Sequence, residues 1–455
     1  MGSMEENEEL HVLMFPWLAH GHITPFFELA KKLVEREITV TICSTASNLT
    51  SIKDQLRETH SSIKTAEISL PQVAGLSPHH QTTKDLPPHL MPHLKRAFHL
   101  SQNQFKDLLR SLKPNFLLHD FIQPWAPEAA LELKIPSSVF LTFSVSCSSF
   151  LYHLVLGKKP NEFPFETMEL HPHESQRIQP MLEQQTFGMR DLERYKSCVE
   201  QSTDFLTCRS MHDIEGKFIN YLSALAGKRV IPVGPLVSSR TPATTDEFFR
   251  QWLDARPEKS VVFTSFGSEY FMSEDEIKEI ALGLELSNLP FIWVIRVSPN
   301  EVIKEINEVL PLGFIERVKE RGLVVGWAPQ GEILRHVAIG GFLTHCGWGS
   351  CMESLGLESP LITLPLQLDQ PFNSRVMTRE VRVGVEVERE SDGGFKGEKV
   401  AKALKMVVLE REGELVRERA RRLAEKIRED GDKGVDELVK EIRRLSLIKG
   451  DENLA

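Results

Sequence analysis

The chain opens with a strand, a loop, a helix and a second strand, and this order constrains the fold more than any other feature. His11–Phe15 is a short apolar run typical of a strand. Thr24 followed by Pro25 predicts a helix start, because Thr is a common N-cap and Pro suits the first helical position. Ile38–Cys43 is predicted as the next strand. Such a βαβ unit implies a parallel sheet with helices on its faces.

The same order restarts in the second half of the chain. Val261–Phe266 is predicted as a strand, and Ser273–Glu276 reads as a capping box that opens a helix. The 455 residues are too many for one hydrophobic core. We therefore expect an α/β protein with two doubly wound domains that face each other across a ligand-binding cleft. The predicted parts are a first domain at 1–235, a linker at 236–250, a second domain at 251–432, and a helix at 433–455 that packs back on the first domain.

Composition excludes several classes of function. The net charge is -10 and no basic stripe stands out, so nucleic acid is not an expected partner. The six cysteines are scattered and form no CxxC pair, which argues against a zinc ribbon and a disulfide scaffold. The acidic N-terminus lacks the apolar core of a signal peptide. These features predict a cytoplasmic protein.

Two segments allow a second interpretation. Ile135–Gly157 has no Lys, Arg or carboxylate and is long enough for a membrane span, but its serines favour a buried strand followed by a buried helix, so no stable membrane insertion is expected. Leu76–His99 is rich in Pro and His. Its His spacing fits no recognisable set of metal ligands, and a mobile surface loop near the cleft is the expectation.

A glycine-rich turn follows the predicted strand Gly341–Thr344. The turn begins at His345, and Ser350 opens a helix. Small residues at a strand-to-helix turn let backbone N–H groups approach an anion, and the helix N-terminus adds its positive dipole end. His345 and Ser350 can donate to the same group, which would make a pyrophosphate cradle. Such a turn, taken alone, is equally compatible with tight packing.

Polar and aromatic residues flank this turn. Trp327, predicted to be exposed after a strand, offers a flat face for a base, and Gln330 and Glu353 can bond ribose hydroxyls. Asp369 and Gln370 end the next predicted strand and supply the carboxylate and amide that a sugar needs. A core tryptophan and an N-capping aspartate are the alternatives for Trp327 and Asp369 taken singly.

The ordered set from Trp327 to Gln370 closely resembles the signature of the plant family-1 UDP-glycosyltransferases. Gly21-His22, Asp120, Phe266-Gly267-Ser268 and Val233-Gly234-Pro235 extend the resemblance over the chain. It implies the GT-B fold, with UDP-sugar held mainly by the second domain and acceptor mainly by the first. The donor contacts that it implies are those to uracil (Trp327, Ala328), ribose (Gln330, Glu353), phosphates (Ser268, His345, Ser350) and sugar (Trp348, Asp369, Gln370).

One position departs from the family pattern. The family commonly has Asn after the second Trp of the signature, and this chain has Gly349. A side-chain contact to phosphate is therefore lost, and the backbone N–H must replace it. The departure resembles the subgroup that adds a sugar to a sugar already on the acceptor, so we interpret Gly349 as a mark of that lineage.

His22 and Asp120 match the family positions for the catalytic base and its partner. A neutral imidazole can take the proton of an acceptor hydroxyl, and a carboxylate on the far ring nitrogen would set the tautomer. His20 is the competing base, although a solvent-facing role suits it better. Thr142 is predicted either to reach the sugar hydroxyls of the donor or to be an ordinary buried strand residue.

These residues predict an inverting transfer of β-linked glucose from UDP-glucose to a sugar of a terpenoid or flavonoid glycoside. The alternatives are transfer to a bare aglycone and a catalytically silent UDP-sugar-binding protein. A glycoside hydrolase would need paired carboxylates, and no convincing pair is found. No cofactor and no metal are expected, since no DxD-type pair is evident.

Overall fold

The computed structural model describes residues 10–59, 62–84, 86–237, 246–267, 270–296 and 306–452. The chain forms two compact units. The first consists of Met1–Glu162, Leu182–Leu236 and Asp432–Ala455, and the second of Phe163–Met181 and Val237–Gly431.

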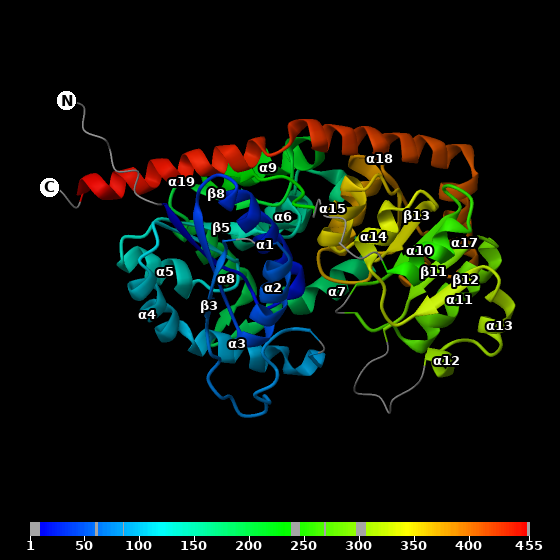
Figure 1. Cartoon of the computed structure of the whole chain (residues 1–455), viewed down its shortest axis with the longest axis horizontal. Helices are drawn as coiled ribbons and strands as arrows, with labels where there is room; N and C mark the ends of the chain where they lie inside the picture. The colour runs from blue at the N-terminus through cyan, green and yellow to red at the C-terminus, as the bar shows by residue number, and fades with distance from the viewer. Residues whose placement is uncertain are drawn as a thin grey trace. The chain divides into compact units, whose positions relative to one another are not determined.

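The first unit is built on a seven-stranded parallel sheet in the order β3-β2-β1-β4-β5-β8-β9. Figure 1 labels its strands β3, β5 and β8. The strand order reverses between β1 and β4, and open α/β sheets bind ligands at such a switch point. Phe15 of β1 pairs with His119 of β4, so the loops that follow these two strands leave the sheet side by side. The strands are β1 (His11–Phe15), β2 (Thr39–Ser44), β3 (Lys64–Glu67), β4 (Phe116–His119), β5 (Ser137–Leu141), β8 (Phe205–Cys208) and β9 (Arg229–Pro232).

Apolar side chains cover both faces of this sheet. Val12 and Met14 of β1 belong to one buried cluster, and Leu13 and Phe15 to another, as expected for a parallel strand buried on both faces. The helices of this unit are α1 (His20–Val34), α2 (Ala46–Thr59), η1 (Pro88–Leu90), α3 (Met91–Leu100), α4 (Gln102–Leu112), α5 (Trp125–Glu132), α6 (Val145–Val155), η2 (Pro160–Glu162), α8 (Asp191–Gln201), α9 (His212–Ala226) and α19 (Lys433–Glu452), with a small hairpin of β6 (Gln185–Thr186) and β7 (Met189–Arg190).

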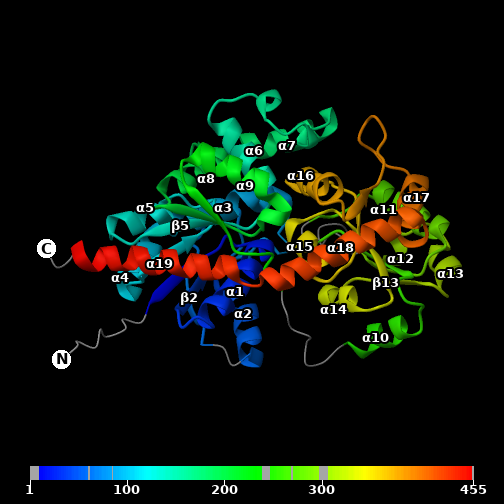
Figure 2. The ribbon, with the colours of Figure 1, turned by 90° about the horizontal axis from the view of Figure 1, so that it is seen from above.

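The last helix of the chain belongs to the first unit. α19 packs against α1 and β9, and Figure 2 shows it running beside α1. Its residues Val435, Leu438 and Ile442 are fully buried in the same cluster as Val12. Gly434 makes this contact possible, because a Cβ there would lie 1.8 Å from the carbonyl oxygen of Pro232. Burial of apolar side chains and the close backbone contact at Gly434 therefore hold α19 on the sheet of the first unit.

The second unit has a six-stranded parallel sheet in the order β12-β11-β10-β13-β14-β15. Its switch point lies between β10 and β13, where Ser265 pairs with Thr344. The strands are β10 (Val261–Ser265), β11 (Phe291–Val294), β12 (Gly322–Val325), β13 (Ile339–Thr344), β14 (Leu361–Thr363) and β15 (Gly384–Glu386). The helices are η3 (Glu166–Met168), most of α7 (Pro172–Glu183), α10 (Glu247–Asp254), α11 (Glu274–Ser287), α12 (Ile306–Val309), α13 (Phe314–Val318), α14 (Gln330–Arg335), α15 (Trp348–Gly356), α16 (Gln370–Arg375), the π-helical turn η4 (Val376–Glu380), α17 (Gly397–Leu409) and α18 (Arg411–Asp430).

The domain limits differ from the predicted ones in two segments, residues 163–181 and the end of the predicted linker 236–250, where α10 already begins at Glu247 as part of the second unit. Residues 163–181 belong by contact to the second unit, although the predicted first domain ran through 1–235. The chain returns to the first unit between Gly431 and Asp432. Of the predicted linker, residues 238–245 lie outside the described residues.

The predicted start of the first helix is wrong. α1 begins at His20, with Ala19 as its N-cap, and Pro25 lies inside the helix. Pro costs a helix one backbone hydrogen bond, and the burial of Phe26, Leu29 and neighbouring residues offsets that cost. The consequence for the site is that His22 sits in the first turn of a helix and not in a loop.

The two ambiguous segments are resolved. Ile135–Gly157 contains β5 and α6, as the buried strand and helix interpretation predicts. The described residues contain no helix that is both long and apolar enough to cross a membrane. Leu76–His99, predicted to be a mobile surface loop, includes η1 and most of α3, whose Leu94 and Phe98 are buried, so that prediction is wrong for its second half. Within the described ranges, no group of His, Cys, Asp and Glu is arranged to hold a metal ion.

Candidate functional site

A histidine and an aspartate meet at the switch point of the first unit. The Nδ1 of His22 lies 2.8 Å from the Oδ2 of Asp120, and the two side chains are 20% and 0% exposed. The two residues are brought together because β1 and β4 are neighbours: α1 follows β1, and Asp120 follows β4. The predicted catalytic residues are therefore in contact.

The carboxylate is held from three sides. The backbone N–H of Trp17 donates to Asp120 Oδ2 (3.0 Å), and the N–H of Phe121 donates to Oδ1 (2.8 Å). His22 makes the third contact. Fixed donors hold an ionised carboxylate in one orientation, so Asp120 can accept from the imidazole without further rearrangement.

Thr142 contacts the same ring nitrogen. Its Oγ1 lies 2.8 Å from His22 Nδ1, and the residue is 4% exposed. One Nδ1–H shared between the Asp120 and Thr142 oxygens satisfies both contacts, and that tautomer carries its lone pair on Nε2. The sequence suggested a sugar contact for Thr142, whereas the hydroxyl bonds the predicted base in this structure. Its role in sugar binding stays a prediction.

His20 has a different environment. It is exposed, and its Nε2 lies 3.4 Å from the Oγ1 of Thr24, which is in the next turn of α1. The buried carboxylate of Asp120 contacts His22 instead. The geometry thus favours His22 over His20 as the base.

The residue before Asp120 provides a test of pH dependence. His119 is fully buried, and burial lowers its pKa to about 4. In the unfolded chain the imidazole of His119 takes up a proton near pH 6.5, whereas in the folded chain it stays neutral until the pH approaches 4. The free energy of unfolding is therefore highest above pH 6.5 and falls as the pH is lowered toward 4. Over this pH range the shift lowers the free energy of unfolding by about 3 kcal/mol.

We expect His119→Asn to flatten the pH dependence of the unfolding free energy between pH 6.5 and 4. Asn keeps a donor where His119 Nδ1 donates to the carbonyl oxygen of Asp120 (3.0 Å), but it does not titrate. Urea unfolding at several pH values measures the slope. His345, which has a similarly lowered pKa, is common to both proteins and cancels in the comparison. Parallel pH profiles for variant and wild type would contradict the prediction.

The second unit forms the predicted glycine-rich turn. β13 ends at Thr344, Cys346 has a left-handed φ of 65°, and α15 begins at Trp348 with Gly347 as its N-cap. The N–H groups of the first helical turn have no partner within the helix. They include the N–H groups of Gly349 and Ser350, which are available to an anion together with the positive end of the helix dipole.

Two glycines make room for the His345 ring. A Cβ would lie 2.7 Å from this ring at Gly267 and 2.9 Å from it at Gly347, and Gly267 also has a left-handed φ of 77°. Burial lowers the pKa of His345 to about 4. The imidazole is therefore neutral at neutral pH and has one N–H to donate. Ser268, which follows Gly267, lies outside the described residues.

The predicted ribose residues form one network. Gln330 Nε2 donates to Glu353 Oε2 (2.7 Å) and to Ser350 Oγ (3.3 Å). Trp327 is 68% exposed after β12, so the alternative of a core tryptophan is wrong for it, and Ala328 beside it is half-buried. The structure thus brings the expected ribose contacts together beside the turn.

Two of the three predicted sugar residues, Asp369 and Gln370, lie at the start of α16. Gln370 is buried, and its Oε1 accepts from the N–H groups of Leu366 (2.8 Å) and Gln367 (2.9 Å). Asp369 is the N-cap residue of α16, but its side chain makes no cap hydrogen bond. Trp348, at the start of α15, is 3% exposed.

Asn373 is a residue of this region that the sequence did not predict. Its Nδ2 donates to the carbonyl oxygen of Cys346 and to Asp369 Oδ2, both at 2.8 Å. It therefore ties the glycine-rich turn to the predicted sugar residues. The four-residue spacing from Asp369, which places both on one helix face, was the available signal.

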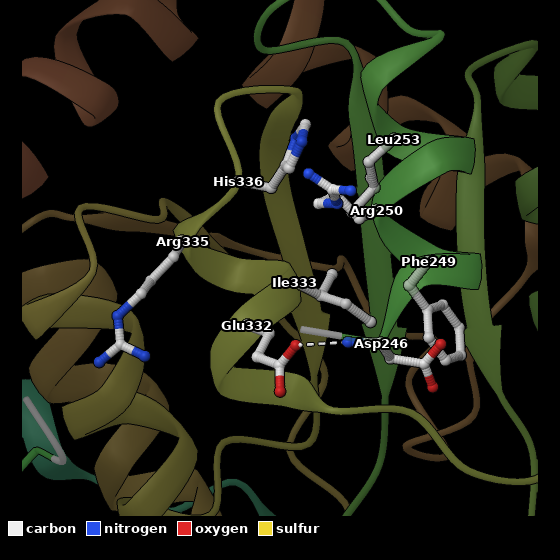
Figure 3. A pocket seen from close by; sticks show the side chains of 8 residues that line it. All are labelled: Asp246, Phe249, Arg250, Leu253, Glu332, Ile333, Arg335 and His336. Carbon is white, nitrogen blue, oxygen red and sulfur yellow. Dashed lines mark hydrogen bonds between the residues drawn. The ribbon is translucent and has the colours of Figure 1, made fainter. Parts of the chain in front are cut away.

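A cavity of about 220 Å³ lies elsewhere in the second unit (Figure 3). It opens between α10 and α14, where the N–H of Asp246 donates to Glu332 Oε2 (3.1 Å). None of the predicted site residues that the structure describes lines it. The residues that do are Asp246, Phe249, Arg250, Leu253, Glu332, Ile333, Arg335 and His336.

Comparison with known proteins gives concordant matches. The family model for UDP-glucoronosyl and UDP-glucosyl transferases matches residues 230–431, and the model for the N-terminal domain of glycosyltransferases matches residues 8–238. UDP-glucosyltransferase 29 of Panax ginseng is 42% identical over 98% of this chain and 99% of its own length. Flavanone 7-O-glucoside 2''-O-beta-L-rhamnosyltransferase of Citrus maxima is 39% identical over 97% of this chain and 98% of its own.

The fold also matches a solved structure. The crystal structure of UGT73P12 from Glycyrrhiza uralensis, complexed with glycyrrhetinic acid 3-O-monoglucuronide, is 28% identical, with a TM-score of 0.83 over 98% of both chains. The predicted GT-B class, with two Rossmann-like units, is confirmed. The chain belongs to the plant family-1 UDP-glycosyltransferases, and among them it resembles the subgroup that extends glycosides.

Proposed function

We propose that this protein transfers glucose from UDP-glucose to a sugar hydroxyl of a small-molecule glycoside of terpenoid or flavonoid type. The observation that carries the proposal is the 2.8 Å contact between His22 Nδ1 and the buried carboxylate of Asp120. An acceptor hydroxyl is a weak nucleophile near neutral pH, and this pair supplies the base that it needs.

In the proposed reaction, Nε2 of His22 takes the hydroxyl proton as the acceptor oxygen bonds the anomeric carbon. The bond from that carbon to the UDP oxygen breaks at the same time, and UDP leaves with the electron pair. Asp120 stabilises the imidazolium that forms. A single displacement at an α-linked donor inverts the configuration, so the product is β-linked.

The leaving group is stabilised by the glycine-rich turn of the second unit. The first-turn N–H groups of α15 and the neutral imidazole of His345 are donors that suit a diphosphate, whose charge grows as the bond breaks. Trp327 is exposed as a base-stacking residue must be, and Gln330 with Glu353 suits a ribose.

The orientation of Gln370 supports a sugar contact. The Oε1 of Gln370 accepts hydrogen bonds from two N–H groups of the loop. Its Nε2 amide group can therefore donate a hydrogen bond to a ligand. Sugar hydroxyl oxygens accept such bonds. The resemblance at Gln370 favours glucose, as does the name of the Panax ginseng relative.

Three observations favour an acceptor that already carries a sugar. Gly349 stands where most of the family has Asn, and the Citrus maxima relative is named for transfer to a glucoside. The Glycyrrhiza uralensis structure likewise contains a glycoside.

A paired acceptor screen tests the proposal. We expect incubation with UDP-glucose to add one hexose to flavonoid or triterpenoid monoglucosides about tenfold or more faster than to the matching aglycones, because a site that bonds sugar hydroxyls loses those bonds with the aglycone. Mass spectrometry measures the products, and NMR of the new anomeric proton tests the β linkage. Preference for aglycones would overturn the sugar-on-sugar assignment. Binding of UDP without transfer to any acceptor would indicate a silent binding protein.

A further inference from the structure

The loop that carries the predicted sugar residues is held by three arginines. This sugar loop, residues 365–371, follows β14 and leads into α16. Arg389 donates to the carbonyl oxygen of Pro365, Arg177 to that of Leu366 (2.8 Å), and Arg375 to that of Pro371 (3.1 Å). All three guanidinium groups come from outside the loop, and they bond carbonyls near both of its ends.

The sugar loop needs such support because its backbone is strained. Leu368, directly before Asp369, has a left-handed φ of 54° and is 42% exposed. A non-glycine residue persists in this conformation when the surrounding contacts define it. Gln370 Oε1 accepts hydrogen bonds from two N–H groups of the loop itself. The three arginines add hydrogen bonds to loop carbonyls from residues outside the loop.

Arg177 comes from a distant part of the chain. It lies on α7, in the segment 163–181, whose sequence position is within the first half but which belongs by contact to the second unit. α7 and the loop together line a small cavity of about 10 Å³, with His173 and Ile178 on one side and Pro365 and Gln367 on the other. α7 therefore packs directly on the sugar loop.

A buried ion pair fixes α7 in this place. Glu174 Oε2 lies 2.5 Å from Arg375 Nη2, and the side chains are 6% and 1% exposed. The same carboxylate oxygen accepts from the N–H of His171 (2.7 Å), which orients it. Buried ion pairs contribute little net stability compared with apolar packing, but they define one arrangement, because any other leaves a buried charge unpaired.

We propose that Arg177 and Glu174 are positioning residues that set the geometry of Asp369 and Gln370 and so determine how well the enzyme binds the sugar of its donor. The inference rests on the proposed function, which assigns Asp369 and Gln370 to the donor sugar. Neither residue of α7 need touch the donor; each acts through the loop. Losing Arg177 should weaken recognition of the sugar while leaving recognition of UDP unchanged.

The test compares UDP with UDP-glucose in Arg177→Ala. Arg177 is exposed, so its removal leaves no buried charge and should not alter the melting temperature. We expect the Kd of UDP, measured by calorimetry, to stay the same and the KM of UDP-glucose to rise about three- to tenfold, the value of one hydrogen bond. Arg177→Lys, which can still donate to Leu366, should restore part of the loss.

Two further variants separate the possible failures. Arg421→Ala removes another arginine of the second unit, one paired with Glu425 on α18, and should change neither constant. Gln370→Ala should weaken binding of UDP-glucose but not of UDP. If it does not, the assignment of Gln370 in the proposed function is wrong. If it does and Arg177→Ala has no effect, or if Arg177→Ala weakens UDP and UDP-glucose equally, the positioning role is overturned.

Discussion

Replacing His22 with alanine is expected to lower the rate of glycosyl transfer about 10²- to 10⁴-fold, the usual contribution of a general base. UDP binding should survive, because the residues assigned to the nucleotide lie in the second unit and His22 lies in the first. Transfer from UDP-glucose to a monoglucoside measures the rate, and calorimetry measures the affinity for UDP.

His20→Ala is the matched control. His20 lies two residues away in the same helical turn, but it is exposed and its Nε2 is near Thr24. It should retain measurable turnover. Full activity in His22→Ala would show that another group accepts the proton, and loss of UDP binding in that variant would show that the substitution acts through folding.

Replacing Gly434 with alanine is expected to destabilise the first unit by about 3 kcal/mol or more, the upper range for overpacking. The new Cβ would meet the carbonyl oxygen of Pro232 at 1.8 Å and the Cα of Val233 at 3.2 Å. These are backbone atoms that no side-chain rotation can move. α19 must shift away, which opens the apolar contact that Leu438 and Ile442 make with the core.

Urea unfolding measures the loss, and hydrogen exchange of α19 locates it. Gly216→Ala on α9 is the matched control, because a Cβ there would find its nearest neighbour, His212, at 3.6 Å. That variant should be as stable as the wild type or slightly more stable, since alanine favours helix over glycine by about 1 kcal/mol. Equal stability of Gly434→Ala and the wild type would mean that α19 is not docked as described.

Local patterns predicted the strands and the glycine-rich turn of the second unit well. Apolar runs and turn residues located β1 and β10 within a residue, and the Ser273–Glu276 capping box forms as expected. The turn from His345 to Ser350 was also visible, because a strand, a glycine-rich turn and a helix start are made by neighbouring residues. A site that is formed by residues adjacent in the chain can be predicted from a short stretch of sequence.

The start of α1 shows where local patterns fail. Thr24 and Pro25 are good helix-start residues, and the sequence favoured them, yet the helix begins at His20. Burial of the apolar face outweighs one lost hydrogen bond, and the amount of burial depends on the sheet beneath the helix. Propensity alone could not reveal it.

Contacts between distant segments were decided by the tertiary structure. The sequence suggested His22 and Asp120 through a family resemblance, but their contact spans 98 residues, and the Thr142 contact to the same nitrogen spans 120. The pairing of Glu174 with Arg375 spans 201 residues and had no signal in the sequence.

The sequence by itself determined two α/β units, the glycine-rich turn and the family. The tertiary structure decided which carboxylate meets which histidine, that α7 packs on the sugar loop, and how α19 docks on the first sheet. The physical reason is that strands, turns and helix starts follow from the residues next to one another, whereas a buried polar contact exists only where packing brings two distant segments within hydrogen-bond distance.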